Sequence, residues 1–266
     1  MPIMDVPIDA ATIRREFEQW ARQENDVSDG DDFTRFSELL TRYLAQPLSD
    51  SERAWAYKHL ANVFACGGRP AEAVRVHEAF EQWLPGKSPR LLSKPPFFYP
   101  APQHAPTAMG PDEIRLQFLA QSVQFATSYG AVGRYDDYVA KADAALAALP
   151  PANDNLEDRF FSVVIFMDAA RLAGDFDRAE QRMVQAKTIA EQAEDPAQAL
   201  KLRAFTVFSE IQLARQREDR ARCREKLQQA LSLVEVLEND EPSKQEWRWF
   251  RDGLVDYATW CNSDYS

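Results

Sequence analysis

His77 and Glu81 come closest to a metal-binding motif in this sequence. They are four residues apart, so a helix would place both on one face, with Glu78 beside them as in the HExxH helix of a metalloprotease. The second histidine of that motif is missing, and neither His59 nor His104 has an obvious place as a further ligand. We therefore interpret the pair as an i, i+4 contact on an exposed helix surface, and we expect no metal.

The cysteines offer no catalytic arrangement either. Cys66 and His59 are seven residues apart, which is about 10 Å along a helix and too far for a Cys–His dyad. We interpret Cys66 as a small thiol packed near a turn. Cys66, Cys223 and Cys261 are odd in number and widely spaced, so they predict neither a disulfide framework nor a zinc knuckle. No nucleophile elbow, P-loop or dinucleotide-binding motif occurs, so we expect a protein that is not an enzyme and needs no cofactor.

The charge balance excludes further classes of function. The 266 residues include 31 Lys and Arg against 42 Asp and Glu, a formal net charge of −11. Proteins that bind nucleic-acid phosphates or anionic membranes usually carry the opposite sign, so we expect neither partner. No apolar run is long enough to span a bilayer, and the first residues lack the basic and apolar regions of a signal peptide. The sequence therefore predicts a cytoplasmic protein.

Helical periodicity dominates the sequence from Ser51 onward and predicts an all-α fold. Amphipathic stretches form helix pairs joined by short turns, at residues 51–66 and 70–84, 112–129 and 135–149, 156–172 and 176–192, and 197–215 and 219–237. A weaker pair at 11–24 and 32–45 precedes them, and a single helix at 243–260 follows. We expect no sheet.

The helix pairs are internal repeats. Their turns can be superposed at Gly68, Gly133, Gly174 and Gln216. Before each turn, the first helix carries a large apolar residue followed by a mostly small one, as in Leu60 and Ala61. Small side chains let helices approach closely, and large ones fill the grooves beside them.

This pattern resembles the tetratricopeptide repeat (TPR) family. The likeness covers about residues 51–237 and rests on the large–small pair, the glycine turn, the alanine of the second helix and the closing proline, as in Ala73 and Pro85. The repeats exceed the family's usual length of about 34 residues, the fourth lacks the glycine, and armadillo and HEAT repeats have similar periods. The resemblance implies a solenoid of four pairs at 51–237, an N-terminal helical pair or cap at 1–50, and a capping helix in 238–266.

The TPR resemblance also implies a groove lined by the first helix of each pair. The candidate partner contacts in this groove are Trp55, Lys58, Asn62, Phe161, Asp168 and Arg171. The fourth pair would add Arg203, Thr206, Glu210 and Leu213. Such a mixture of apolar and single polar groups suits a peptide or helix laid in a groove. The alternative is that other parts of the same chain fill this wall.

Lys58 and Asn62 also match two positions of the carboxylate clamp with which some TPR proteins bind chaperone C-termini. The other clamp positions do not match, because Gln124 replaces an asparagine, and Phe161 and Ile165 replace basic residues. We therefore do not expect chaperone-tail binding.

A basic run at residues 215–226 stands out in this acidic chain. Three of its members, Arg217, Arg220 and Arg224, are expected to share a helix face. One interpretation is a solvated face with acidic neighbours at helical spacing. The other is a docking patch for an acidic partner.

The insertion at residues 85–111 holds eight of the chain's 16 prolines. Proline blocks helix interiors, so we expect extended and polyproline-II backbone. Phe97, Phe98 and Tyr99 would leave a large apolar surface in water. We therefore expect them to dock, either as a strap on the first two repeats or as an arm that binds a partner or covers the groove.

An apolar stripe near the C-terminus consists of Trp247, Phe250, Leu254, Tyr257 and Trp260. It is interpreted as a cap on the last repeat or as an interface.

The function expected from the sequence is a non-catalytic scaffold or adaptor that holds a protein or peptide segment in the groove. The alternative is a regulatory or sensor subunit whose groove binds a peptide and switches a partner. The sequence leaves the oligomeric state open.

Overall fold

The computed structural model of the protein describes residues 10–22, 30–86, 110–120, 123–149, 156–240 and 246–262. Within these ranges the regular structure is helical and no strand occurs, which confirms the predicted all-α class. The chain divides into two compact units, Met1–Ala148 and Leu149–Ser266, and each is described by itself. None of the described helices combines the length and apolar character needed to cross a bilayer.

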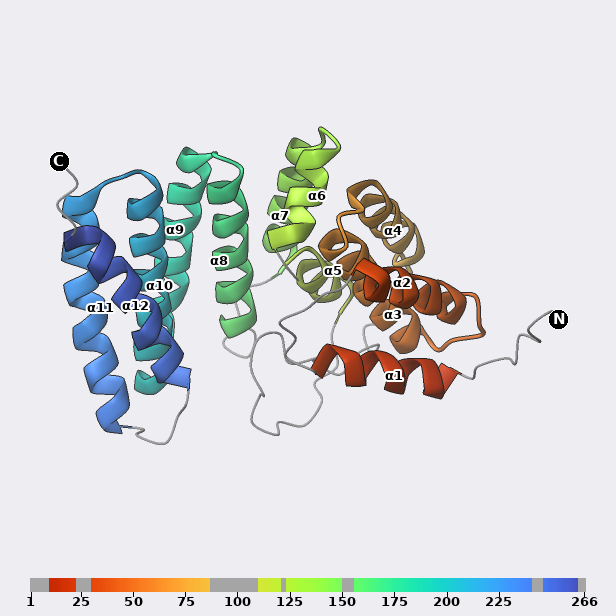
Figure 1. The fold of residues 1–266 in the computed structure, drawn as a ribbon, viewed down its shortest axis with the longest axis horizontal. Helices are drawn as coiled ribbons and strands as arrows, with labels where there is room; N and C mark the ends of the chain where they lie inside the picture. The colour runs from red at the N-terminus through yellow and green to blue at the C-terminus, as the bar shows by residue number, and fades with distance from the viewer. Residues whose placement is uncertain are drawn as a thin grey trace. The chain divides into compact units, whose positions relative to one another are not determined.

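The first unit contains seven described helices, which Figure 1 labels in chain order. They are α1 (Ala10–Arg22), α2 (Gly30–Leu44), α3 (Asp50–Cys66), α4 (Pro70–Trp83), α5 (Pro111–Leu119), α6 (Val123–Ala131) and α7 (Tyr135–Ala148). Helix α3 packs against α2, α4 and α6, and α5 packs against α7. Residues 87–109, which include Phe97, Phe98 and Tyr99, lie outside the described residues.

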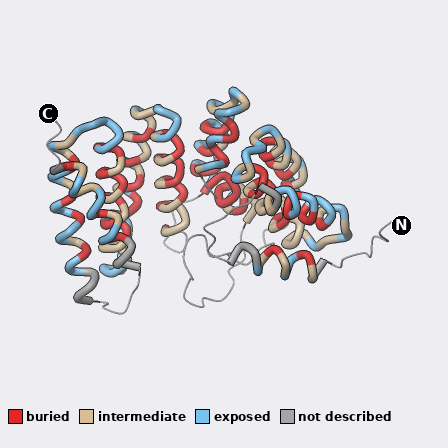
Figure 2. The backbone as a smooth tube through the Cα atoms, in the orientation of Figure 1, coloured by how far each residue is buried: buried red, intermediate tan, exposed pale blue. Residues whose placement is uncertain are grey.

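The second unit contains five described helices. They are α8 (Leu156–Leu172), α9 (Phe176–Ala190), α10 (Pro196–Gln216), α11 (Arg220–Asp240) and α12 (Glu246–Asn262). Helices α8 and α9 form one packed pair, α10 and α11 form the next, and α12 packs against α11. In both units the buried residues lie on the helix sides that face packed neighbours, as Figure 2 shows.

Short polar and proline signals begin several of these helices. At the start of α3, the Ser49 side chain accepts a hydrogen bond from the Glu52 amide, and the Glu52 carboxylate accepts one from the Ser49 amide. This reciprocal pair satisfies two backbone N–H groups that the first turn leaves without partners. Helices α4, α5 and α10 begin with a proline, whose missing N–H costs nothing at that position.

The turns between paired helices share one backbone geometry. Gly68, Gly133 and Gly174 have φ between +70° and +80°, and the amide that follows each one bonds a carbonyl five residues back. The fourth turn has the same hydrogen bond, from the amide of Asp219 to the carbonyl of Ala214, and its left-handed residue is Glu218 at φ +58°. The sequence superposition at Gln216 was therefore wrong by two residues.

The helix predicted at 112–129 is in fact two helices, α5 and α6. All residues from 116 to 120 are buried. An amphipathic surface helix keeps one face exposed to solvent, and this stretch has no such face. The Tyr138 hydroxyl donates a 3.0 Å hydrogen bond to the Leu119 carbonyl at the end of α5. That bond satisfies an acceptor that the helix end leaves open.

Candidate functional site

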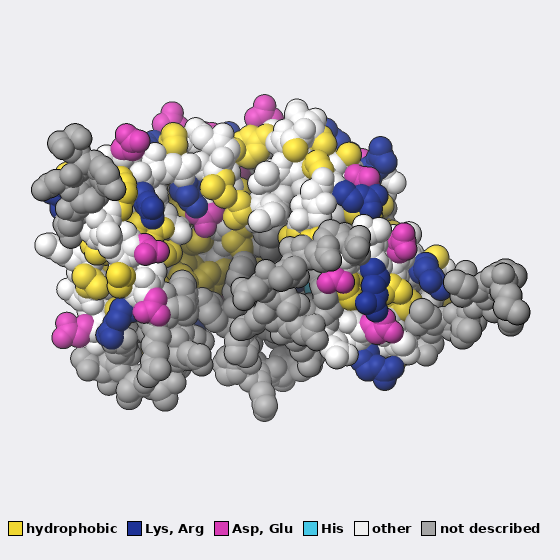
Figure 3. Space-filling model, in the orientation of Figure 1, with side chains coloured by type: hydrophobic (Ala, Val, Ile, Leu, Met, Phe, Trp, Pro, Cys, Tyr) yellow, Lys and Arg dark blue, Asp and Glu magenta, His cyan; other side chains and the backbone are white. Residues whose placement is uncertain are grey.

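One stripe of α8 is partly accessible on a helix that is otherwise deeply packed. Between residues 160 and 171 it consists of Phe161, Val164, Asp168 and Arg171, and every other residue in that range is buried. These four residues, here called the α8 stripe, are spaced three and four apart and so lie on one helix face. Three of them are groove residues predicted from the sequence. Figure 3 shows hydrophobic side chains gathered in a hollow over α8 and α10, beside α12.

The α8 stripe is apolar at one end and polar at the other. The Phe161 ring meets Phe205 of α10 edge to face, with centroids 5.1 Å apart. At the other end, Nε of Arg171 lies 3.1 Å from Oδ1 of Asp168, and its Nη1 donates a 2.7 Å hydrogen bond to the side chain of Gln216. Burial raises the pKa of Asp168, and the neighbouring Arg171 opposes that rise. The polar end is thus held in a fixed geometry.

The equivalent stripe of α10 follows once the fourth turn is placed at Glu218. Phe161 lies 13 residues before Gly174, and the same offset from Glu218 gives an α10 stripe of Phe205, Phe208, Gln212 and Arg215. Three of the four residues predicted from the sequence for this wall were therefore wrong, whereas Arg203 is exposed. Thr206, Glu210 and Leu213 are buried, because the corrected register turns them toward the packed interior.

Helix α12 covers the α10 stripe. The ring of Phe250 lies 5.0 Å from that of Phe208 and 6.0 Å from that of Phe205. Tyr257 meets Phe208 edge to face at 5.7 Å, and the Arg215 guanidinium lies 5.1 Å from the Tyr257 centroid. These contacts place Phe250 and Tyr257 of the C-terminal apolar stripe against α10 of the same unit. They match the alternative that parts of the chain fill the predicted wall.

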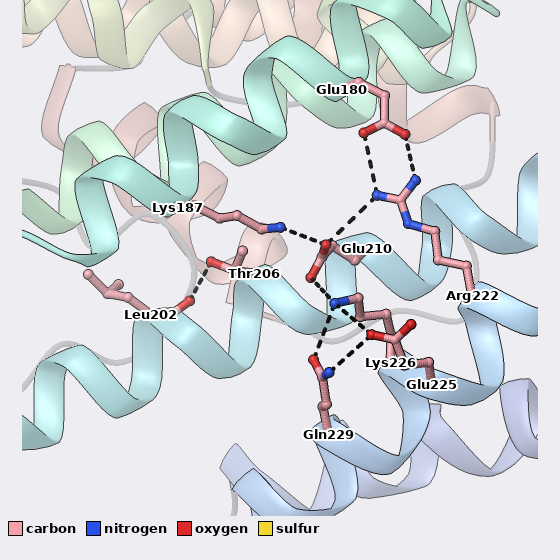
Figure 4. Close-up of polar contacts among 9 residues, drawn as sticks. All are labelled: Glu180, Lys187, Leu202, Thr206, Glu210, Arg222, Glu225, Lys226 and Gln229. Atoms are coloured by element: carbon pink, nitrogen blue, oxygen red, sulfur yellow. Dashed lines mark hydrogen bonds and ion pairs between the residues drawn. The ribbon is translucent and has the colours of Figure 1, made fainter.

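A buried carboxylate fixes α10 to its two neighbours. Glu210 is 3% exposed, and the Lys187 ammonium of α9 lies 2.7 Å from its Oε1. From α11, Lys226 approaches it at 3.7 Å, and Arg222 bridges from Glu210 to Glu180 of α9 (Figure 4). A buried carboxylate is tolerated only with such partners. The cluster therefore sets the position of α10, and with it the α10 stripe.

The basic run has partners within its own unit. Arg217 lies 3.4 Å from Glu180, the Arg220 guanidinium lies 5.5 Å from the Trp260 centroid, and Arg224 donates to the Cys261 carbonyl at 3.1 Å. The expectation of one shared helix face was wrong, because Arg217 follows the last residue of α10, whereas Arg220 and Arg224 lie on α11. Docking of a partner on these arginines remains a prediction.

In the first unit, α1 covers the predicted groove residue Trp55. Its indole lies edge to face with Phe17 of α1 at 5.5 Å and with Tyr43 of α2 at 5.7 Å. The Arg14 guanidinium of α1 lies 5.0 Å from the indole centroid. His59, one turn further along α3, contacts both Trp55 and Phe17, and burial lowers its pKa to about 3. This end of the predicted wall is thus occupied by the chain's own first helix.

Lys58 and Asn62 share that face of α3 and are partly accessible. Burial lowers the pKa of Lys58 to about 8. The Cys66 thiol lies 3.7 Å from the Asn62 side-chain oxygen, and Cys66 is exposed. The interpretation of Cys66 as a packed thiol was therefore wrong. Trp55, Lys58 and Asn62 belong to the first unit, whereas Phe161, Asp168 and Arg171 belong to the second.

His77 is a buried polar centre that the sequence analysis placed wrongly on an exposed surface. It is 0% exposed, its Nδ1 hydrogen-bonds the Tyr129 hydroxyl, and its ring stacks on Phe118. Its Nε2 lies 3.3 Å from Glu81, which also pairs with Arg115 at 3.1 Å. Burial lowers the pKa of His77 despite the opposing effect of Glu81. The signal was available, because His77 lies three and four residues from the apolar Val74, Ala73 and Phe80.

Among the residues that the structure describes, no group of three or more His, Cys, Asp or Glu side chains could hold a metal ion. No protein-family model and no curated protein matches the sequence. The α8 stripe is partly accessible, as are the predicted groove residues Lys58 and Asn62 of the first unit.

Proposed function

We propose that this protein is a non-catalytic scaffold or adaptor that binds a segment of a partner protein on the inner faces of TPR-like helix pairs. The recurrence of one turn geometry at Gly68, Gly133, Gly174 and Glu218 supports a repeat architecture. Equivalent turns give equivalent helix faces, so the same kind of surface recurs along the chain.

The observation that carries the proposal is the packing of α12 on the α10 stripe. The α8 and α10 stripes occupy equivalent positions, and both begin with phenylalanine and end with arginine. On α10 this surface holds an amphipathic helix through Phe250 and Tyr257. Amphipathic helices commonly dock in apolar grooves through residues at such spacing. Phe161 and Arg171 of the α8 stripe contact α10, but the stripe stays partly accessible, so we expect it to bind a similar helix from another protein.

Affinity capture with matched variants tests this function. Phe161→Ala removes the apolar anchor of the α8 stripe, whereas Val184→Ala truncates a 62% exposed residue on α9 as a control. Loss of a central interface anchor costs about 2 kcal/mol or more, which is about 30-fold in affinity. We expect a partner that wild type and Val184→Ala recover equally and that Phe161→Ala loses, with circular dichroism showing intact folding. Equal recovery by all three proteins would contradict the proposal.

The same α12 packing favours one alternative, a regulatory subunit whose groove binds a peptide and switches a partner. In that case the incoming peptide displaces α12 from Phe208 of the α10 stripe. Hydrogen exchange distinguishes the two functions, because displaced helices exchange faster. A regulatory subunit would show faster exchange across residues 246–262 on partner binding. A scaffold that uses the α8 stripe would leave exchange in that helix unchanged.

A further inference from the structure

Cys223 and Cys261 come together in the interior of the second unit. Cys223 lies in the first turn of α11, and Cys261 lies in the last turn of α12. Both residues are 0% exposed and belong to one hydrophobic cluster with Leu227, Phe250 and Leu254. Neither is bonded to another cysteine, so both carry free thiols.

Two observations place these cysteines near each other. The neighbouring Cys261 side chain contributes, after burial, to the raised pKa of the Cys223 thiol. The residue after Cys223, Arg224, donates a 3.1 Å hydrogen bond to the backbone carbonyl of Cys261. This second contact holds the backbone of the last turn of α12 against the start of α11. The two cysteines therefore lie in one buried cluster where the end of α12 meets the start of α11, and such proximity is the first requirement for a disulfide.

We propose that Cys223 and Cys261 are a redox modification site that forms a reversible intramolecular disulfide and fastens α12 to α11. The oxidant is a small disulfide of the glutathione class. One cysteine thiolate attacks oxidised glutathione and releases one glutathione thiolate. The second cysteine thiolate then attacks the mixed disulfide and releases the other glutathione. Two protein thiols are oxidised to one disulfide, and one glutathione disulfide is reduced to two glutathione molecules.

The environment of the pair makes this reaction depend on movement of α12. Burial raises the pKa of Cys223 to about 12, and the neighbouring Cys261 adds to the rise. The thiolate is the reactive form, so exchange in the closed state is slow and proceeds when the end of α12 opens. Once formed, the disulfide retains α12 and the Phe250 contact over the α10 stripe. It therefore controls how readily that stripe becomes free.

Oxidation in the absence of any partner tests the proposal, so its outcome is independent of the proposed function. Cys66→Ser removes the exposed thiol and leaves the buried pair as the only cysteines of the chain. This variant is equilibrated in glutathione buffers of increasing oxidised fraction, trapped with acid, denatured and alkylated. Peptide mapping then identifies the bonded cysteines.

We expect a peptide that links Cys223 to Cys261, formed in oxidising buffer and lost again in reduced glutathione. We also expect the oxidised form to melt about 5 °C or more above the reduced form, because the bond closes a long loop in the unfolded chain. Adding Cys261→Ser should abolish both effects. Two fully alkylated cysteines after prolonged oxidation would overturn the proposal. So would stable mixed disulfides with glutathione in place of the linked peptide.

Discussion

Phe208 of α10 and Phe250 of α12 lie with their ring centroids 5.0 Å apart. Phe208 is the second residue of the α10 stripe, and Phe250 is fully buried. Together with the Tyr257 contact, the contact between these two rings shows that a helix face in this protein accepts a helix carrying aromatic residues two turns apart. The equivalent α8 stripe presents Phe161, Val164, Asp168 and Arg171, and the other α8 residues between positions 160 and 171 are buried.

The shared turn geometry predicts opposite effects of two substitutions. Glu218 has a left-handed backbone at φ +58°, which costs an ordinary side chain about 1 kcal/mol relative to glycine. Glu218→Gly is expected to raise the free energy of unfolding by about 0.5–1 kcal/mol. Gly174→Ala is expected to lower it by about 1 kcal/mol, and an added Cβ there would meet no atom within 4 Å, so sterics are not involved. Urea unfolding measures both, and a stability loss in Glu218→Gly would contradict the assignment of this turn.

The Glu210 cluster predicts a large loss of stability when the negative charge of Glu210 is removed. Glu210→Gln leaves Lys226 and Arg222 partly buried without their shared carboxylate. Breaking such a buried pair costs about 3 kcal/mol. Glu225→Gln is the matched control, because Glu225 also pairs with Lys226, at 3.3 Å, but is largely exposed. We expect the control to change stability by less than about 0.5 kcal/mol. Similar unfolding midpoints for the two variants would contradict the role given to Glu210.

Helix α1 packs on Trp55, and this packing predicts energetic coupling between Trp55 and Phe17 of α1. Truncating Trp55 to alanine is expected to cost about 3 kcal/mol. The edge-to-face contact at 5.5 Å should appear in a double-mutant cycle as a coupling energy of about 1 kcal/mol. Chemical unfolding of wild type, Trp55→Ala, Phe17→Ala and the double variant gives this number. Additive losses would mean that α1 does not hold the indole.

His77 predicts a pH dependence of stability in a defined direction. Because burial lowers its folded-state pKa below the ordinary value of about 6.5, the unfolded chain binds more protons at this residue as the pH falls below that value. Stability present above pH 6.5 is therefore lost on acidification. Between pH 7.5 and 5, wild type should lose up to about 2 kcal/mol more than His77→Gln. His59 is present in both proteins, so its contribution cancels. Parallel stability curves for the two proteins would contradict a buried neutral His77.

Local signals allowed most helices to be predicted from the sequence. Glycines at 68, 133 and 174 mark left-handed turns, and the prolines at 70 and 196 lie at helix starts. The predicted boundaries of the helices beside these residues agree with the structure within two residues. The fourth turn was misplaced because its left-handed residue is a glutamate, which carries no such signal. The division between α5 and α6 was missed because it depends on tertiary contacts, including the Tyr138 hydroxyl bond to Leu119.

Residues of the candidate site could be predicted only where helical spacing determines which side chains share a face. Phe161, Asp168 and Arg171 share one face because they are seven and three residues apart, and the structure leaves that face partly accessible. The sequence could not show that α1 would pack on Trp55 or that α12 would pack on α10. Those pairings join residues far apart in the chain, and they depend on the packing of whole helices. The contact between Cys223 and Cys261 has the same origin.

Site-specific photocrosslinking in the native host tests partner binding on the α8 stripe most directly. A photoreactive phenylalanine analogue replaces Val164 in the α8 stripe, and in a control protein it replaces the 62% exposed Val184 of α9. We predict a covalent adduct with one partner protein at position 164, none at position 184, and loss of the adduct when Phe161→Ala is added. An adduct at 184 but not at 164, or no adduct at 164 with the protein folded and expressed, would contradict the account.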